Sequence, residues 1–243
     1  PQSETGWRHA DRYQVPRICF VNKMDRVGAD FYKTMGSMTE RLNASPVAIQ
    51  IPIGTEESFS GVLDLVEGRS LTFPEGPPQP PVEGPIPEDM MGDFEKYRQI
   101  LTERVAETDD SLTEKFLEGA EISKDEIKEG LRRATIEYKL VPVLCGSALN
   151  NRGVQPLLDA VCDYLPSPSD VPPAEGTDHK SGETVTRVPR LDEPFSALVF
   201  KAVADPFIGR LVYFRVYSGE MHSGSMVFNS TTGRRERLGR IVQ

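Results

Sequence analysis

The spacing of apolar residues predicts two short buried strands, each followed by a polar loop and a helix. The runs at residues 18–21 and 141–145 are continuously apolar and lie between turn residues, as is typical of strands buried in a parallel sheet. Helical spacing follows the first run, with apolar residues at Phe31, Met35, Met38 and Leu42. A second helix, with its apolar face at Leu157, Leu158, Val161 and Leu165, follows the second run.

Between these runs the pattern becomes that of an α+β insertion. Residues 47–53 alternate like a strand, and residues 61–66 and 69–73 flank Glu67-Gly68, which predicts a hairpin. Seven prolines among the 14 residues from Pro74 to Pro87 predict a stiff, extended connection outside the core.

Helical patterns resume at about residue 88. One apolar stripe contains Met90, Phe94, Tyr97, Leu101 and Val105. Ser123 and Glu126 form a capping-box signal that opens another helix.

The last part of the chain reads as all-β. A polar linker is expected over residues 171–189, and residues 195–204 and 211–218 then alternate like strands. The predicted fold class is therefore α/β with an α+β insertion, followed by the start of a β-barrel or sandwich.

Composition suits a soluble globular protein of one to three domains. The 243 residues are 38% apolar and carry a formal net charge of −9. No run of 18 apolar residues predicts a membrane span, and no signal peptide is seen. Three scattered cysteines do not make a disulfide framework, which favours a reducing compartment. Because the chain starts at Pro1 without Met, we expect a fragment of a longer protein.

Charge is concentrated in two blocks of opposite sign. Residues 83–130 hold 15 Asp/Glu and 6 Lys/Arg, a net of −9, whereas residues 207–243 hold six Arg and two Glu, a net of +4. Two such blocks favour two different partners. The alternative, of equal weight on charge alone, is that acidic helices simply have solvated faces.

The loop after the first buried strand carries the chemistry of guanine recognition. It reads Asn22-Lys23-Met24-Asp25. A carboxylate accepts two parallel hydrogen bonds from guanine N1–H and the exocyclic amine, a donor pair that adenine lacks. The Lys stem can lie over the base, and the Asn amide can tie the loop down. On this motif alone, a polar turn remains an alternative.

A second loop, Gly146-Ser147-Ala148, follows the other buried strand. Its backbone N–H groups can donate to guanine O6, and its Ser hydroxyl can brace Asp25. Ligands bind at the carboxyl ends of strands in open parallel sheets. Two motifs at two such ends therefore favour a guanine site over a polar turn.

With these loops the sequence resembles bacterial-type elongation factor G, a family of ribosomal GTPases that drive tRNA and mRNA translocation. The residues that carry the resemblance to its fourth and fifth nucleotide motifs are 17–26 (RICFVNKMDR) and 143–148 (VLCGSA). It continues through residues 153–160, 164–168, 193–197, 205–207, 214–219 and 240–243, and so covers essentially the whole chain.

The resemblance implies a domain plan and a nucleotide site. Residues 1–44 and 139–170 correspond to the second half of a P-loop-type G domain, residues 45–138 to its G′ insertion, and residues 190–243 to the start of β-barrel domain II. The guanine-binding residues would be Asn22, Lys23, Asp25, Ser147, Ala148 and Leu149. No catalytic or metal-binding residue is expected here, because the sequence contains no G-x-x-x-x-G-K-[ST] phosphate loop. GTP or GDP with Mg²⁺ would be held in the full-length protein, with none bound tightly by this segment.

The resemblance also implies ribosomal partners in the cytoplasm of a bacterium, or in an organelle as the alternative. The stalk protein would dock on the acidic helix at Ile100, Glu103, Glu107 and, if the helix continues, Asp110. Ribosomal RNA would meet Arg234, Arg235, Arg237 and Arg240. The alternatives are release factor three, a ribosomal-protection protein, a second paralogue of elongation factor G, or a stalk-binding module that binds no nucleotide.

Overall fold

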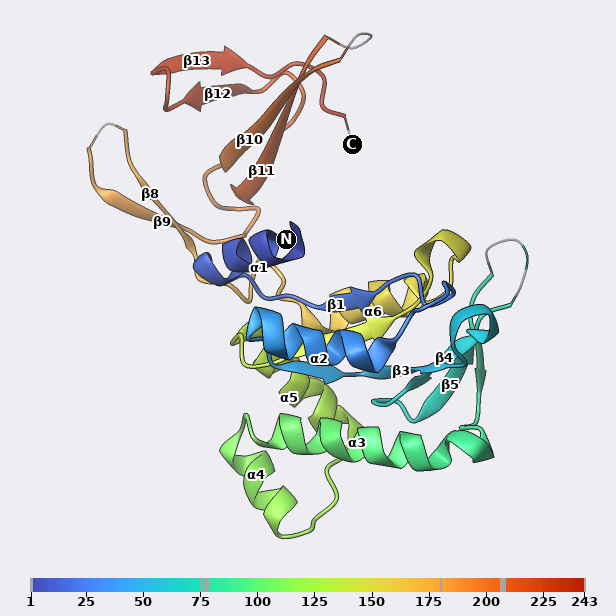
Figure 1. Ribbon diagram of the computed structural model, residues 1–243. Helices are drawn as coiled ribbons and strands as arrows, with labels where there is room; N and C mark the ends of the chain where they lie inside the picture. Colours follow the sequence, from blue (N-terminus) through green and yellow to red (C-terminus); the bar gives the residue numbers. More distant parts are fainter. Residues whose placement is uncertain (1, 75, 77–78, 180, 206–208, 243) are drawn as a thin grey trace. The chain divides into compact units, whose positions relative to one another are not determined.

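The computed structural model describes residues 2–74, 76, 79–179, 181–205 and 209–242. The chain forms two compact units, Pro1–Pro166 and Ser167–Gln243, and each is described by itself (Figure 1). Among the segments quoted for the resemblance, residues 206–207 and 243 lie outside the described residues, as do Pro77 and Pro78 of the proline-rich segment.

The first unit is built on a three-stranded parallel sheet in the order β1-β7-β2. Its strands are β1 (Cys19–Val21), β7 (Val141–Cys145) and β2 (Pro46–Ala48). The two predicted strands are confirmed as β1 and β7. All five residues of the central strand β7 are buried as expected, whereas the three residues of β1 are only half-buried. A continuous apolar run is what a strand covered on both faces requires.

Three helices flank this sheet: α1 (Gln2–Arg12), α2 (Phe31–Leu42) and α6 (Val154–Tyr164). In Figure 1, α2 passes in front of the strands and α6 lies behind them. The carboxylate of Asp30 caps α2 by accepting from the amide of Lys33, and the helix ends at Asn43 in the left-handed conformation, with φ 50°.

The single strand predicted over residues 47–53 is wrong, because the chain changes sheet in the middle of it. The first part is β2 and the second is β3 (Gln50–Ile53) of another sheet. Ile49 links the two, since its amide donates to Val143 O at 3.1 Å and its carbonyl accepts from Leu65 N at 3.0 Å. Apolar alternation alone does not reveal which neighbour each half will find.

The second sheet is antiparallel, in the order β3-β4-β5-β6. Its remaining strands are β4 (Gly61–Asp64), β5 (Arg69–Thr72) and β6 (Val82–Gly84). The predicted hairpin at Glu67-Gly68 is confirmed, and the Asp64 carboxylate accepts from the amides of Val66 and Glu67. The proline-rich connection contains the short edge strand β6, which was not predicted. Its three residues include no proline, so they can pair with β5.

Three helices complete the first unit. They are α3 (Met91–Ala106), α4 (Asp110–Leu117) and α5 (Lys124–Ile136), with a 3-10 turn over Glu88–Met90 before α3. The predicted apolar stripe of α3 is confirmed, because Leu101 and Val105 are buried. The predicted capping box is also present at the start of α5, between Ser123 and Glu126.

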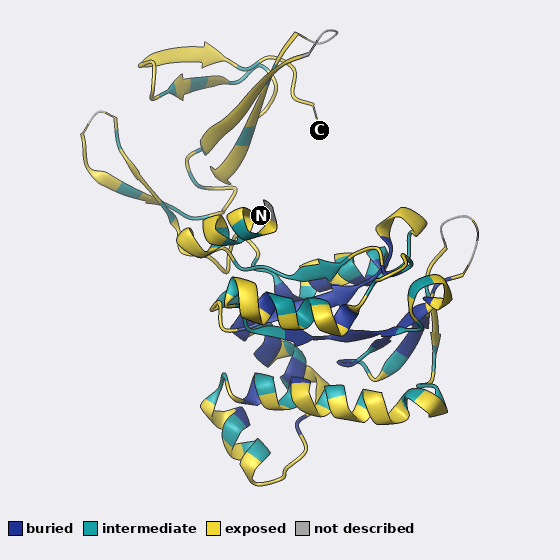
Figure 2. Ribbon diagram, viewed as in Figure 1, coloured by how far each residue is buried: buried dark blue, intermediate teal, exposed yellow. Residues whose placement is uncertain are grey.

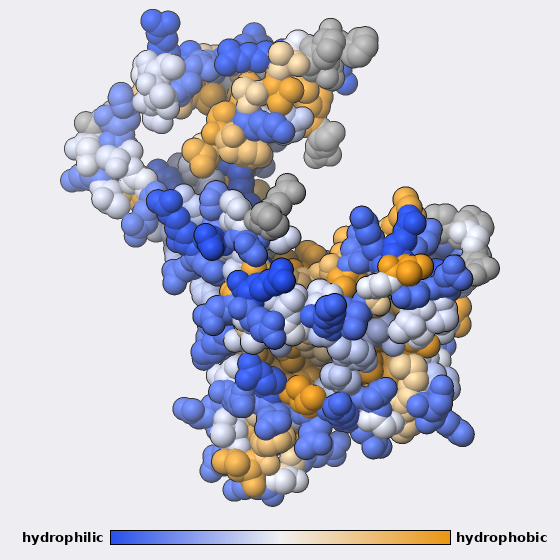
Figure 3. Space-filling model, viewed as in Figure 1, coloured by the Kyte–Doolittle hydropathy of each residue, from blue (hydrophilic) through white to orange (hydrophobic). Residues whose placement is uncertain are grey.

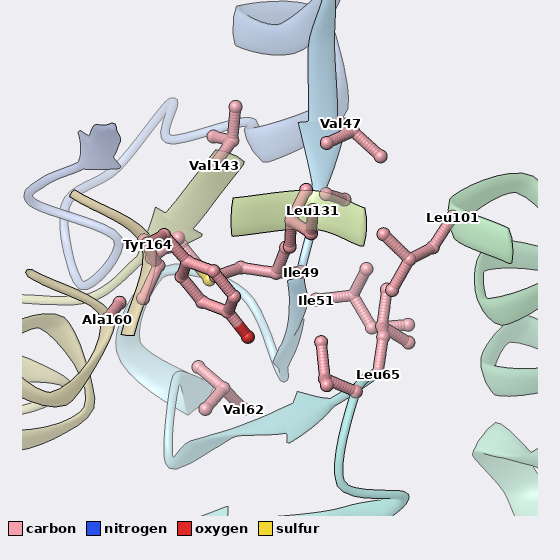
Figure 4. Packing of buried hydrophobic residues seen from close by; sticks show 14 of the residues in the cluster. Val47, Ile49, Ile51, Val62, Leu65, Leu101, Leu131, Val143, Ala160 and Tyr164 are labelled. Carbon is pink, nitrogen blue, oxygen red and sulfur yellow. The ribbon is translucent and has the colours of Figure 1, made fainter. Parts of the chain in front are cut away.

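One apolar core joins both sheets and their helices. Figure 4 shows side chains from β2 and β7 packed with others from the antiparallel sheet, α3, α5 and α6. The labelled residues are Val47, Ile49, Ile51, Val62, Leu65, Leu101, Leu131, Val143, Ala160 and Tyr164, all of them buried. Buried residues gather around these strands in Figure 2. The insertion therefore shares its core with the parallel sheet, and movement of one strains the other.

The second unit consists of antiparallel strand pairs. They are β8 (Ala174–Thr177) with β9 (Thr184–Arg187), β10 (Ser196–Asp205) with β11 (Gly209–Ser218), and β12 (Met226–Asn229) with β13 (Arg234–Arg237). The two long strands match the predicted alternation. The hairpin β8–β9 lies within the segment expected to be a linker. Figure 3 shows hydrophobic side chains on the surface over β10 and β11, where Phe200 is 64% exposed.

Candidate guanine-nucleotide site

Two loops run side by side from the carboxyl ends of β1 and β7. The strands are paired in parallel, with Val21 opposite Cys145. Hydrogen bonding continues beyond the strands, because Gly146 N donates to Val21 O and Met24 N donates to Gly146 O, each at 3.0 Å. The first loop, residues 22–28, and the second, residues 146–152, therefore form one surface.

Asn22 ties the two loops together. Its side-chain oxygen accepts from Lys23 N at 2.8 Å and from Ala148 N at 2.9 Å. Lys23 adopts φ 65°, a left-handed conformation that an L-residue holds only when its surroundings compensate. Met24, only 1% exposed, anchors the loop in the core. Asn22 thus fixes the loops to each other, which is the role the sequence predicts for its amide group.

Gly146 is required where the second loop leaves β7. A Cβ atom there would lie 2.3 Å from Arg152 O and 2.6 Å from the Phe20 ring. The loop then folds back on itself, because Ser147 N donates to Arg152 O and Arg152 N donates to Ser147 O, each at 2.9 Å. This pairing buries Ser147, which is 1% exposed.

Asp25 meets the second loop through its carboxylate. A hydrogen bond from the Ser147 side chain lowers the pKa of Asp25, and the positive charges of Arg26 and Arg152 act in the same direction. The Asn150 amide also donates to Asp25 Oδ2, at 2.9 Å. Asp25 is therefore ionised at neutral pH, and the second loop holds its carboxylate in place. An ionised carboxylate can accept hydrogen bonds from two N–H donors.

The structure brings together most of the residues predicted for this site. Asn22, Asp25, Ser147 and Ala148 are joined by the hydrogen bonds just described. The side chains of Lys23 and Leu149 project from the same loops; both are exposed, Leu149 at 83%. Asn150 was not predicted. The only signal in the sequence was a polar side chain close after the Ser-Ala pair.

Residues 1–167 match the family model of the elongation factor Tu GTP binding domain. The chain belongs to this family. Residues 194–243 match the model of elongation factor G domain 2. The predicted fold class, a partial G domain with an insertion followed by a β-rich domain, is confirmed by these matches and by the observed strands.

Curated relatives confirm the resemblance to elongation factor G over the full length of the chain. Elongation factor G of Thermotoga maritima is 54% identical over 242 residues, which is 100% of this chain and 35% of that protein. Elongation factor G of Thermotoga petrophila gives the same values. The chain thus spans about a third of the length of these relatives. A crystal structure of a Thermus thermophilus protein matches with a TM-score of 0.76 at 28% identity, over 97% of this chain and 32% of that one.

The predicted acidic surface lies on two helices instead of one. Glu103 is on α3, Glu107 is the C-cap residue of that helix, and Asp110 opens α4. The helix does not continue to Asp110 because Asp109 interrupts it and caps α4, accepting from the amides of Ser111 and Leu112. All three acidic residues are exposed, and Glu107 pairs with Arg104 at 2.8 Å.

Ile100 lies beside apolar residues, which its helical position did not predict. It is 40% exposed and borders a shallow hollow of about 170 Å³. The other lining residues come from α2, β2 and α3: Phe31, Tyr32, Met35, Pro46, Val47, Ala48 and Tyr97. The rings of Tyr32 and Tyr97 stack there, with centroids 5.1 Å apart. Ile100 therefore borders an apolar hollow as well as the acidic face.

The predicted basic surface is on β13 and the residues after it. Arg234, Arg235 and Arg237 belong to this exposed strand, and Arg240 is also exposed. Among the described residues, none of these four arginines forms an ion pair within 4.0 Å. The intervening Glu236 is engaged by Asn229, whose amide donates to it at 2.8 Å.

Neither a metal site nor a membrane helix is found in the described parts of the chain. They hold no group of three or more His, Cys, Asp or Glu residues placed to bind a metal ion. None of their helices is both long and apolar enough to cross a bilayer. The cysteines Cys19, Cys145 and Cys162 are free thiols.

Proposed function

We propose that this chain is the guanine-reading part of a translational GTPase of the elongation factor G type. The observation that carries the proposal is that two contacts hold the loop of Asp25 against the second loop. The Ser147 side chain hydrogen-bonds the Asp25 carboxylate, and the Asn22 side chain accepts from Ala148 N. Guanine supplies two N–H donors on one edge, and the ionised carboxylate of Asp25 supplies the matching acceptors.

The residues present fit the base of GTP or GDP better than its phosphates. Asp25 would accept from the base, the exposed Lys23 stem would cover one of its faces, and Leu149 would lie close to it. The 243 residues contain no G-x-x-x-x-G-K-[ST] sequence, so we assign the phosphates and Mg²⁺ to other parts of the full-length protein. In that protein the bound Mg²⁺ would stabilise charge on the phosphates during hydrolysis.

The identity of the relatives favours elongation factor G over release factor three and the ribosomal-protection proteins. The full-length protein would hydrolyse GTP on the ribosome and drive translocation, and we expect to find it in the cytoplasm. The second candidate is that this chain acts purely as a binding module for the stalk protein and binds no nucleotide. It is favoured only by the acidic surface formed by Glu103, Glu107 and Asp110.

Two ribosomal surfaces extend the proposal. The acidic surface with Ile100 would dock the stalk protein, because an apolar anchor ringed by carboxylates suits a basic partner. The arginines of β13 would contact ribosomal RNA, since Arg is suited to phosphate oxygens.

Competition among nucleotides tests the proposed function directly. A fluorescent GDP analogue is bound to the full-length protein and displaced with GDP, ADP or XDP. We expect GDP to compete at least ~100-fold better than ADP, because a site built to pair with a donor rejects bases that lack it. Equal competition by GDP and ADP would leave only the stalk-binding alternative.

The RNA contact is tested by reversing charge at Arg234 and Arg235 to Glu. If these arginines meet phosphates, ribosome binding weakens and its dependence on salt concentration becomes shallower, by roughly one unit of slope for each lost contact. A binding curve whose salt slope matches the unmodified protein would assign the two arginines a structural role.

A further inference from the structure

The turn that joins β3 to β4 holds both guanine loops. This insertion turn, residues 54–60, includes a 3-10 segment at Glu56–Ser58. Glu56 Oε1 accepts from Gly28 N at 2.7 Å, at the end of the first loop. From the second loop, the Arg152 guanidinium donates to the carbonyl of Phe59. One turn of the insertion thus contacts two loops that lie far from it in sequence.

The insertion turn is firmly attached to the antiparallel sheet. Thr55 N donates to Ser58 Oγ at 3.0 Å, and that hydroxyl donates back to Thr55 O at 2.7 Å. Phe59 is fully buried, and the centroid of its ring lies 6.3 Å from that of Phe73, which directly follows β5. Gly54 allows the tight turn, with φ 78° and no room for a Cβ beside Ser58 O. The turn therefore moves with the sheet and not independently of it.

Glu56 is held in an unfavourable backbone conformation. Its φ is 52°, in the left-handed region that side chains with a Cβ avoid. Such conformations persist where surrounding contacts over-determine them, and they gather at functional sites. The contact here is the one with Gly28 N. The adjacent Glu57 is exposed, and within the described residues its side chain has no hydrogen bond or ion pair. Of the two neighbouring carboxylates, the one that contacts the guanine loop is therefore the one on the unfavourable backbone conformation.

We propose that Glu56 and Arg152 are positioning residues for guanine recognition, which hold the loops at 22–28 and 146–152 in the register that aims Asp25 at the base. The inference rests on the proposed function and deepens it. It makes the antiparallel sheet of the insertion a structural support of the base site. A partner that shifts the insertion would then change the affinity for the guanine base.

The test compares GDP with IDP, whose base lacks the exocyclic amine and so loses one bond to Asp25. Dissociation constants are measured with the full-length protein and its Glu56→Ala variant. We expect Glu56→Ala to weaken the binding of GDP roughly five- to tenfold and the binding of IDP less than about twofold. The reason is that a misplaced carboxylate first loses the bidentate pairing, which only GDP can make. Arg152→Ala should show the same selective loss.

Two matched variants separate positioning from general stability. Glu57→Ala removes a neighbouring carboxylate of the same turn and should bind both nucleotides as the unmodified protein does. Glu56→Gln keeps an oxygen that accepts from Gly28 N and should restore GDP affinity to within about twofold. Equal weakening of GDP and IDP by Glu56→Ala, or no weakening, would overturn the inference.

An Asp25→Asn variant in the same series separates the two levels of the proposal. If Asp25→Asn abolishes the preference for GDP over IDP while Glu56→Ala leaves it intact, the positioning role is wrong and the guanine site stands. If Asp25→Asn also leaves the preference intact, the proposed function itself fails.

Discussion

At the scale of single residues, the geometry of the candidate site depends on a few side chains that cannot be replaced without losing a hydrogen bond or creating a steric clash. Asn22 uses one side-chain oxygen to accept from two backbone amides, one in each loop. Ser147 is buried, and its side chain hydrogen-bonds the Asp25 carboxylate. Gly146 lets the second loop pass close to Phe20. Each of these residues acts on the position of Asp25, so we expect substitutions here to change affinity and stability together.

Gly146→Ala should destabilise the first unit by about 1–3 kcal/mol, because the added methyl group overlaps a carbonyl oxygen and an aromatic ring. Urea unfolding of the chain measures the loss. Gly36→Ala is the matched control: Gly36 lies inside α2, and a Cβ atom added there would meet no heavy atom within 4 Å. We expect that control to stabilise the helix by about 0.5–1 kcal/mol. Equal effects of the two substitutions would contradict the steric account of Gly146.

At the scale of elements, local signals predicted most elements but not every buried face. Leu158 and Val161, expected on the apolar face of α6, are 60% and 40% exposed. The apolar runs of β1 and β7, the stripe of α3 and the capping box of α5 follow from spacing alone. Spacing did not reveal that Ile49 would join two sheets, that β6 would pair at an edge, or that Asp109 would end one helical path and start another. Those outcomes are decided by contacts with distant residues.

The capping box of α5 makes the stability of that helix depend on pH. The Lys115 ammonium group, together with the amide of Ser123, lowers the pKa of Glu126 to about 2. Because the folded pKa is below the unfolded value of about 4.3, Glu126 stabilises the fold above that value and loses this effect as pH falls toward 2. Glu126→Gln should therefore unfold more easily than the unmodified chain at pH 7, with the difference shrinking below about pH 4.3.

Thermal unfolding at a series of pH values measures this effect, with Glu129→Gln as the control on the same helix. Glu129 is exposed, and its side chain has no hydrogen bond or ion pair in the described residues. A gap between Glu126→Gln and the unmodified chain that stays constant down to about pH 2.5 would contradict the role of the ionised carboxylate.

At the scale of the whole molecule, the shared core connects the guanine loops to the surface of the insertion. The buried side chains of α3 pack in the same cluster as those of β2 and β7. The candidate stalk surface and the base site therefore belong to the same compact unit, the first one, and share its core. The sequence proposes residues for both surfaces, whereas the hydrogen bonds of Asn150, Glu56 and Arg152 join loops that meet only in the folded chain.

Reversing Glu103, Glu107 and Asp110 to Lys should slow ribosome-stimulated GTP turnover of the full-length protein by roughly tenfold or more at low salt, because attraction between charged surfaces speeds association. Intrinsic GDP affinity should be unchanged, since these residues lie outside the guanine loops. Stalk-dependent stimulation is measured with ribosomes that carry or lack the stalk protein. Full stalk-dependent stimulation of the triple variant would show that the acidic surface does not dock the stalk protein.

The central claim is that the Asp25 carboxylate reads guanine, and the most direct measurement is the relative affinity of the Asp25→Asn full-length protein for GDP and XDP. An amide offers one acceptor and one donor, and its donor suits the 2-oxo group of xanthine. We predict that GDP affinity falls by roughly two to three orders of magnitude while XDP becomes the preferred ligand. Asp159→Asn, an exposed carboxylate on α6, should leave both affinities unchanged. An Asp25→Asn protein that still prefers GDP to XDP as strongly as the unmodified protein would contradict the account.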